Sequence, residues 1–262
     1  MEHGVSWFSY LPGFANFEHF LHGYQTHGVL GQPVIAQHVV AGFLVSIVIC
    51  LVALRARGAL ARAKDGGLIP EPGVSLRNVL DLVFEALYGQ MKAIIGAQTP
   101  RYFPVIATLA MFIFFSNVLG LIPGFLPPTD NLNTTFACSI FVFLYYNYHG
   151  IRVNGFNHFA HMANPTGQRW GWFLMPLMLP IEIVSHLARP FSLGVRLAAN
   201  MIGDHAVLTA FLGLVPILVP LPFLALGLFV CVVQTFVFVL LTTIYIALAV
   251  AHHDHEPAHA AA

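Results

Sequence analysis

The sequence predicts an all-α protein that crosses a membrane several times. Of its 262 residues, 58% are hydrophobic and only 8% are charged, whereas soluble domains carry about 25% charged residues. Apolar runs of about twenty residues, the length that spans a bilayer as a helix, recur along the chain. Basic residues stand at the ends of several of these runs. Together these observations predict one polytopic membrane domain over residues 1–262.

The first predicted span covers residues 34–54. Four basic residues follow it within ten positions: Arg55, Arg57, Arg62 and Lys64. Because cytoplasmic loops are enriched in Lys and Arg, this segment places the end of the span in the cytoplasm and residues 1–33 outside. Residues 1–33 lack the basic start and short apolar core of a cleavable signal, so we expect the first span to anchor the chain.

Residues 74–95 show a helical periodicity of a different kind. Apolar residues face one side and charged residues the other, namely Leu76, Val79, Leu80, Val83, Leu87, Met91 and Ile94 against Arg77, Asp81, Glu85 and Lys92. This pattern predicts an amphipathic helix that lies on the cytoplasmic membrane surface or against a partner, and does not span.

Two further spans, residues 103–123 and 132–151, form a predicted hairpin. Their connection contains no Lys or Arg, whereas Arg101 precedes the pair and Arg152 follows it. The turn is therefore expected outside and both ends of the hairpin on the cytoplasmic side.

Hydropathy alone leaves the last third of the chain ambiguous. Residues 206–251 contain no Asp, Glu, Lys or Arg, and 46 helical residues would reach roughly 70 Å, which is too long for one perpendicular span. Pro216, Pro220 and Pro222 interrupt the run. Counting alone would give three spans, 172–188, 206–219 and 223–250, the middle one too short.

Several functional classes find no support in the composition. The eleven basic and eleven acidic residues balance, so no nucleic-acid partner is implied. The three cysteines, Cys50, Cys138 and Cys231, lie in apolar runs without paired spacing, which argues against disulfides or a zinc site. No glycine-rich phosphate loop is present, and no cofactor is expected. The histidines of the tail 251–262 are typical of a solvated end, because nothing fixes a metal geometry.

Arg196 interrupts a strongly apolar stretch. An arginine at the centre of a bilayer helix costs about 2.5–3.5 kcal/mol on insertion scales, which makes it a candidate functional residue. On a helix, a set of polar residues would share its face within roughly 80°: Glu182, His186, Arg189, Asn200 and Asp204. This stripe should face protein or water. An ion pair with Glu182 or Asp204 is the structural alternative, but these lie roughly 21 and 12 Å away along the axis.

A longer motif surrounds this arginine. The run Arg189-Pro190-x-Ser192-Leu193-x-x-Arg196-Leu197-x-x-Asn200-Met201, with Gln234-Thr235-Phe236-Val237-Phe238 beginning 33 residues later, resembles subunit a of F-type ATP synthases. The resemblance extends through 116–123, 182–185 and 242–245, and covers most of the chain from about residue 100; the first hundred residues match only in layout. Ala198-Ala199 replaces a frequent Phe-Gly, and Asp204 replaces a small residue.

The resemblance implies perpendicular spans, a surface amphipathic helix and a C-terminal hairpin of two long tilted helices, residues 172–214 and 222–250, against a rotor. It implies a non-catalytic subunit that moves protons through two half-channels to and from a rotating c-ring. The implied partners are the c-ring, the peripheral-stalk b subunits, the remainder of the synthase and the lipid bilayer. The expected location is a bacterial plasma (inner) membrane, with the N-terminus outside and the C-terminus cytoplasmic.

The resemblance also implies roles for individual residues. Arg196 would separate the half-channels. His205 lies 180° around the helix from it and would line the outer half-channel, where Gly227 occupies a position that often carries a second titratable group; Asp204 would then supply what Gly227 lacks. Gln234 and Tyr245 share the face of the last helix toward the stripe, with Gln234 near Arg196 and interhelical packing as the alternative. Asn117 either lines the outer half-channel or packs helices. Glu182 and His186 would belong to the cytoplasmic exit.

Two other functional classes compete with this interpretation. A self-contained transporter or ion channel usually shows two related halves, and no such repeat is visible here. An intramembrane metalloenzyme would need clustered ligands such as His-Glu-x-x-His, whereas Glu182 and His186 form a single pair.

Overall fold

The computed structural model describes residues 36–62, 75–122, 124–155, 171–214 and 220–250, together with Phe14, Asn16 and His19. All regular structure in these ranges is helical, which confirms the all-α prediction for them. The elements, in order, are α2 (Ala36–Arg62), α3 (Leu76–Ile95), η2 (Gly96–Gln98), α4 (Thr99–Gly120), η3 (Pro128–Asp130), α5 (Leu132–Asn154), α7 (Gly171–Leu214) and α8 (Pro220–Val250).

Three helical segments of the described ranges are long and apolar enough to cross a membrane. They are Gln37–Ala61, Leu76–Gly120 and Leu221–Val250. The second includes both the amphipathic α3 and the apolar α4, joined by the short turn η2. The polytopic membrane class is therefore supported by helix length and composition.

Local sequence signals explain most helix ends. Ser75 caps α3 by accepting a hydrogen bond from the backbone N–H of Asn78, and Asn131 caps α5 in the same way through Asn133. Gly96 and Gly155 end α3 and α5 with positive φ angles of 79° and 57°, which favour glycine. The helix α2 continues to Arg62, beyond the predicted end at residue 54, because its basic segment is rich in good helix formers.

The helix α7 runs without interruption from Gly171 to Leu214, although Pro176, Pro180 and Pro190 lie inside it. At 1.5 Å per residue its 44 residues reach roughly 66 Å. It does not end near residue 188, where hydropathy counting would end a span. All the stripe residues from Glu182 to Asp204 consequently lie on one helix.

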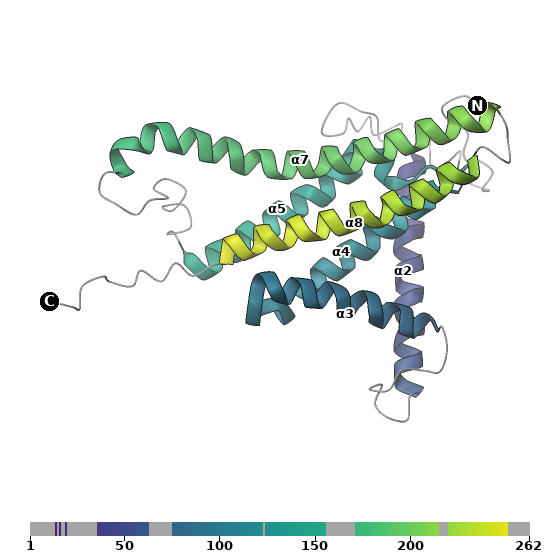
Figure 1. The fold of residues 1–262 in the computed structure, drawn as a ribbon, viewed down its shortest axis with the longest axis horizontal. Helices are drawn as coiled ribbons and strands as arrows, with labels where there is room; N and C mark the ends of the chain where they lie inside the picture. Colours follow the sequence, from purple (N-terminus) through teal and green to yellow (C-terminus); the bar gives the residue numbers. More distant parts are fainter. Residues whose placement is uncertain are drawn as a thin grey trace.

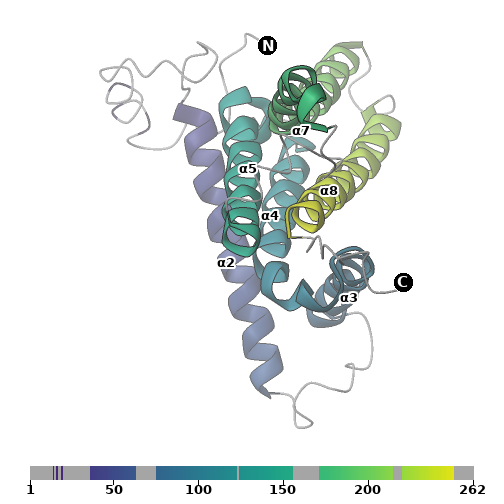
Figure 2. The same ribbon diagram turned by 90° about the vertical axis from the view of Figure 1, so that its left-hand side faces the viewer.

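The helices form two groups that cross steeply. In Figure 1, α2 stands upright, whereas α7 and α8 run side by side across its direction. Figure 2 shows α4 and α5 between α2 and the α7–α8 pair, with α3 beneath α8. The helix α5 packs against α7 and α8, and α4 packs against α2, α3 and α8. The central hairpin thus joins the upright helix to the long pair.

The core draws on α3, α4, α5, α7 and α8. Its largest fully buried side chains include Met91, Tyr102, Tyr146, Leu197 and Phe238. Close approach of α7 to α5 depends on a glycine: a Cβ on Gly194 would lie 2.9 Å from Ser139 Oγ and 3.4 Å from a ring carbon of Phe136. Position 194 therefore has no room for a larger side chain.

The amphipathic helix α3 differs from its predicted pattern at one residue. Arg77 was expected on the polar face but is only 4% exposed, and its Nε lies 3.6 Å from Asp81 Oδ2. The helices α2, α4 and α8 pack against α3, and their packing accounts for this burial. Large apolar side chains of α3 remain exposed, including Leu76, Val79, Leu82 and Val83. This face suits a membrane surface or a partner.

Candidate functional site

Arg196 lies near the middle of α7 with its side chain exposed. The neighbouring Leu193 and Leu197 are 2% and 0% exposed and hold this part of α7 in the core. On the side of Arg196, the exposed residues one or two turns away are Asn200 and the small residues Ser192, Ala199 and Gly203. Small residues allow another membrane helix to approach closely. The guanidinium is thus presented where a partner helix has room.

The exposed surface of the two long helices is otherwise strongly apolar. Exposed large side chains occur on both long helices, including Phe191 and Ile202 on α7 and Phe229, Val232, Val233 and Phe236 on α8. Contact with lipid would satisfy these apolar groups but not a permanently charged guanidinium. This combination indicates a protein partner at Arg196.

One turn from Arg196, a hydrogen bond connects the two long helices. The amide of Asn200 donates from Nδ2 to Oε1 of Gln234 at 2.6 Å. Gln234 is only 4% exposed, so the bond forms at the contact between α7 and α8. This interaction fixes the rotation of α8 beside Arg196.

A second polar group lies toward the start of α7, at its contacts with α5 and α8. His186 Nε2 lies 2.9 Å from Asn147 Oδ1 and 3.5 Å from the hydroxyl of Tyr146. The guanidinium carbon of Arg189 lies 5.3 Å from the centre of the Tyr245 ring, in the range of a cation–π interaction of about 0.5–2 kcal/mol. The rings of Tyr146 and Tyr245 are 5.9 Å apart. Five polar or aromatic side chains from three helices therefore meet here.

Glu182 is not one of the five side chains of this group. It is half-buried on α7, one turn before His186. The structure therefore places Glu182 next to this second polar group along the helix.

Asp204 lines a cavity of about 200 Å³ on the other side of Arg196. The cavity lies between the end of α4 and the long helices, and Gly227 of α8 lines it too, with Gly120, Leu121, Met201, Val207, Leu208, Phe223, Leu224 and Leu226. A side chain at position 227 would collide with Leu121, because a Cβ there would lie 2.5 Å from Cδ2 of that leucine. Asp204 thus supplies a carboxylate to the cavity, whereas Gly227 supplies no side chain to it.

His205 is half-buried and does not line this cavity. It interacts electrostatically with Asp204 and also with His38 of α2. The charge of His205 therefore influences both the carboxylate of the Asp204 cavity and a histidine of the first helix. His205, a residue of α7, thus also interacts with the first helix, α2.

Asn117 makes a buried contact at the end of α4. Thr129 Oγ1 donates a hydrogen bond to Asn117 Oδ1 at 2.9 Å, and the two residues are 0% and 2% exposed. The bond attaches η3 to α4. Of the two roles expected for Asn117, the structure shows the packing contact.

Sequence reasoning missed several members of this arrangement. Tyr146 and Asn147 lie within an aromatic run of α5, and their only signal was polarity inside a predicted span. His38 carried the same signal at the start of α2. Its Nδ1 lies 3.2 Å from the carbonyl oxygen of Pro127, 89 residues away in the chain, a contact that no local pattern reveals.

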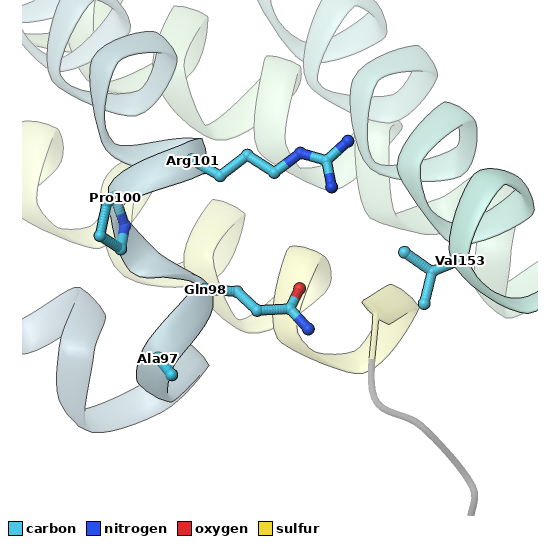
Figure 3. A pocket seen from close by; sticks show the side chains of 5 residues that line it. All are labelled: Ala97, Gln98, Pro100, Arg101 and Val153. Atoms are coloured by element: carbon cyan, nitrogen blue, oxygen red, sulfur yellow. The ribbon is translucent and has the colours of Figure 1, made fainter.

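A larger cavity of about 420 Å³ lies elsewhere, between the start of α4 and the end of α5. Figure 3 shows the side chains of Gln98 and Arg101 extending across it toward Val153. It is separated from the Asp204 cavity by the length of α4, because Arg101 and Gly120 are at opposite ends of that helix. We do not include it in the candidate site.

Among the described residues, no group of three or more His, Cys, Asp or Glu side chains could hold a metal ion. The tail 251–262 and nearly all of residues 1–33 lie outside the described ranges.

Comparison with known proteins gives a consistent result. The family model of the ATP synthase A chain matches residues 39–247. ATP synthase subunit a of Bdellovibrio bacteriovorus is 48% identical over 203 residues, 76% of this chain and 86% of the relative. That of Sorangium cellulosum is 44% identical over 214 residues, 81% and 82% of the two chains. That of a Sulfurihydrogenibium species is 40% identical over 219 residues, 84% and 99%.

These matches run through the helices that carry Arg196, Asn200, Asp204 and Gln234. The chain therefore belongs to the ATP synthase subunit a family, the non-catalytic, multi-pass membrane subunits that conduct protons to the c-ring of an F-type ATP synthase.

Proposed function

We propose that Arg196 divides the proton path of this subunit into an outer and an inner half. The observation that carries the proposal is the exposed guanidinium on a face that is otherwise small or apolar, beside the Asn200–Gln234 hydrogen bond. A self-contained transporter would have no need for such a charge on an outer face. Removing this charge should therefore abolish proton-driven ATP synthesis, measured in inverted membrane vesicles.

The chemistry of the division follows from the charge. Each ring subunit must carry a carboxylate that is neutral in lipid and ionises to pass this subunit. A guanidinium stays charged in proteins and favours the ionised form of a carboxylate that comes within 4 to 6 Å. Its positive charge also repels a proton that would pass directly from one half to the other. Lysine would be a poor substitute, because a dehydrated ammonium group loses its proton readily.

The outer half contains the Asp204 cavity and His205. Support comes from the cavity itself, which is lined by the Asp204 carboxylate and by Gly227, and from the electrostatic interaction of Asp204 with His205. A histidine accepts and donates protons near neutral pH. Protons would enter here and load the ring carboxylate.

The inner half contains Glu182, His186 and Tyr245. The polar group formed by His186, Asn147, Tyr146 and Tyr245 lies on the opposite side of Arg196 along α7. It offers hydrogen-bonding side chains where a proton would leave the ring. Arg189, held against the Tyr245 ring, keeps this group ordered.

The proposal also includes the orientation of the chain in the membrane and the partners of its exposed faces. The exposed basic residues Arg55 and Arg57 at the end of α2, and Arg101 and Arg152 at the ends of the α4–α5 hairpin, favour the cytoplasmic side for these ends. The N-terminus would then be outside and the C-terminus cytoplasmic, in a bacterial inner membrane.

The apolar face of α7 and α8 would meet the c-ring. The exposed apolar face of α3 would meet the membrane surface or the peripheral-stalk b subunits.

Replacing Gln234 by leucine should reduce proton-driven synthesis by no more than several-fold. The change deletes the acceptor of the Asn200 bond but keeps the charge of Arg196, and membrane hydrogen bonds contribute about 0.6 kcal/mol on average. Thr235→Val is a matched control, because the Thr235 hydroxyl bonds only within α8, to the carbonyl of Cys231. The measurement is the rate of proton-driven ATP synthesis of both variants in inverted vesicles. A leucine variant as inactive as Arg196→Ala would assign Gln234 a direct role.

Replacing Asp204 by asparagine should preserve turnover but shift its dependence on external pH toward acidic values. The carboxylate attracts a proton that enters the cavity, so its removal means that loading needs a higher external proton concentration. The measurement is ATP synthesis against external pH at fixed total driving force. In a His205→Ala background the Asp204 change should cause no shift. An unchanged profile for Asp204→Asn would limit the carboxylate to lining the cavity.

A further inference from the structure

His38 is a buried ionisable residue that the proton path described above does not use. It lies in the first turn of α2 and is 8% exposed. Its Nδ1 lies 3.2 Å from the carbonyl oxygen of Pro127. Because a carbonyl only accepts hydrogen bonds, Nδ1 must carry the hydrogen in this contact. In the neutral ring Nε2 is then the nitrogen with a lone pair, ready to take up a proton.

Ionisable side chains of two other elements act on His38 of α2. Asp130 of η3 and His205 of α7 both interact electrostatically with it. Among the described residues, the other elements packed against α2 carry charged groups that include Arg101, at the opposite end of α4 from Gly120, and the Arg77–Asp81 pair of α3. The described ionisable groups that act on His38 are one carboxylate and one histidine.

The positions of Asp130, His38 and His205 give the order in which an entering proton would meet them. Asp130 is half-buried in the loop between α4 and α5, so solvent reaches it in part. The buried Thr129–Asn117 hydrogen bond holds that loop on the end of α4. His205 lies one residue beyond Asp204 on α7. In the orientation proposed above this loop faces outside, and His38 stands between it and His205.

We infer that His38 is a proton-relay residue at the outer mouth of the entry path, between Asp130 and His205. The inference rests on the proposed function. A proton taken up at Nε2 gives an imidazolium with both nitrogens protonated. Its release from Nε2 toward His205 restores the same neutral ring, and the Nδ1–H bond to Pro127 persists throughout. The alternative is that His38 only fastens α2 to the loop.

Replacing His38 by glutamine separates these roles. The glutamine amide can still donate to the Pro127 carbonyl but takes up no proton in the physiological range. Synthesis per assembled complex, in whole synthase reconstituted in vesicles, should fall at least about fivefold. The loss should be greatest at alkaline external pH. His38→Glu restores a titratable group and should recover activity with a profile shifted toward acidic external pH. His19→Gln, the same change at an exposed histidine, should have no effect.

A His38→Gln complex with wild-type synthesis and a wild-type external-pH profile would overturn the relay. If in the same assay Arg196→Ala is inactive, only the relay is lost and the proposed function stands. If His38→Gln does not assemble, Asp130→Asn gives the decision through the profile. Loss of the carboxylate beside His38 should shift the profile toward acidic values, and an unchanged profile would again overturn the relay.

Discussion

Replacing Arg196 by alanine is expected to abolish proton-driven ATP synthesis and leave the assembled synthase in the membrane. The side chain is exposed and does not belong to the buried core, so its loss removes a charge and keeps the packing of α7 through Leu193 and Leu197. Without that charge a ring carboxylate is no longer driven to ionise. Synthesis in inverted vesicles should fall below about a tenth of wild type, a barrier increase of at least about 1.4 kcal/mol.

Two further variants test whether the loss of synthesis is specific to a guanidinium at position 196. Arg196→Lys should also be inactive or nearly so, because lysine loses its proton more readily in a dehydrated site. Arg57→Ala, the same change at an exposed arginine near the basic end of α2, should retain synthesis. Activity above a tenth of wild type in Arg196→Ala would defeat the assignment of the central charge.

Replacing Gly194 by leucine is expected to disrupt the folded subunit itself. A Cβ at this position already lies within 3.4 Å of two atoms of α5, and leucine adds three further carbons to it. Overpacking of this kind costs about 1–3 kcal/mol, which corresponds to a fall of roughly 2–12 °C in the unfolding midpoint of a chain of this size. Thermal unfolding of the purified subunit in detergent measures it.

Gly203 provides the matched control for Gly194. It lies on the same helix, and a Cβ there would meet no atom within 4 Å. Both substitutions replace a glycine inside α7, so any gain in helix propensity is common to the pair. Gly203→Leu should therefore unfold at or above the wild-type temperature. Equal midpoints for the two variants would contradict the close packing of α7 on α5.

The sequence was most informative where one helix carried the pattern. The spacing from Glu182 to Asp204 makes sense only on a continuous helix, and α7 is continuous over this range. The composition was enough to predict an all-α membrane protein, because apolar runs of this length have few alternatives. Ser75, Asn131, Gly96 and Gly155 mark helix ends by local chemistry that a reader can recognise in the chain.

Contacts between helices were beyond such reasoning. The stacking of Arg189 on Tyr245 and the bond from His38 to Pro127 join residues 56 and 89 positions apart. Periodicity gives the face of a helix but not its neighbour. The burial of Arg77 shows the same limit, since a helix that packs against α3 changed the environment of one polar position.

The continuity of α7 has a consequence for the distance that a proton is carried. Asp204 and His186 are 18 residues apart on one continuous helix, which is about 27 Å along its axis. Because α7 runs across the direction of α2 in Figure 1, most of this separation is sideways in the plane of the membrane if α2 crosses it upright. Entry and exit are then laterally offset, with Arg196 between them. Under the proposed function, a proton completes the crossing only when a moving carrier supplies this lateral displacement.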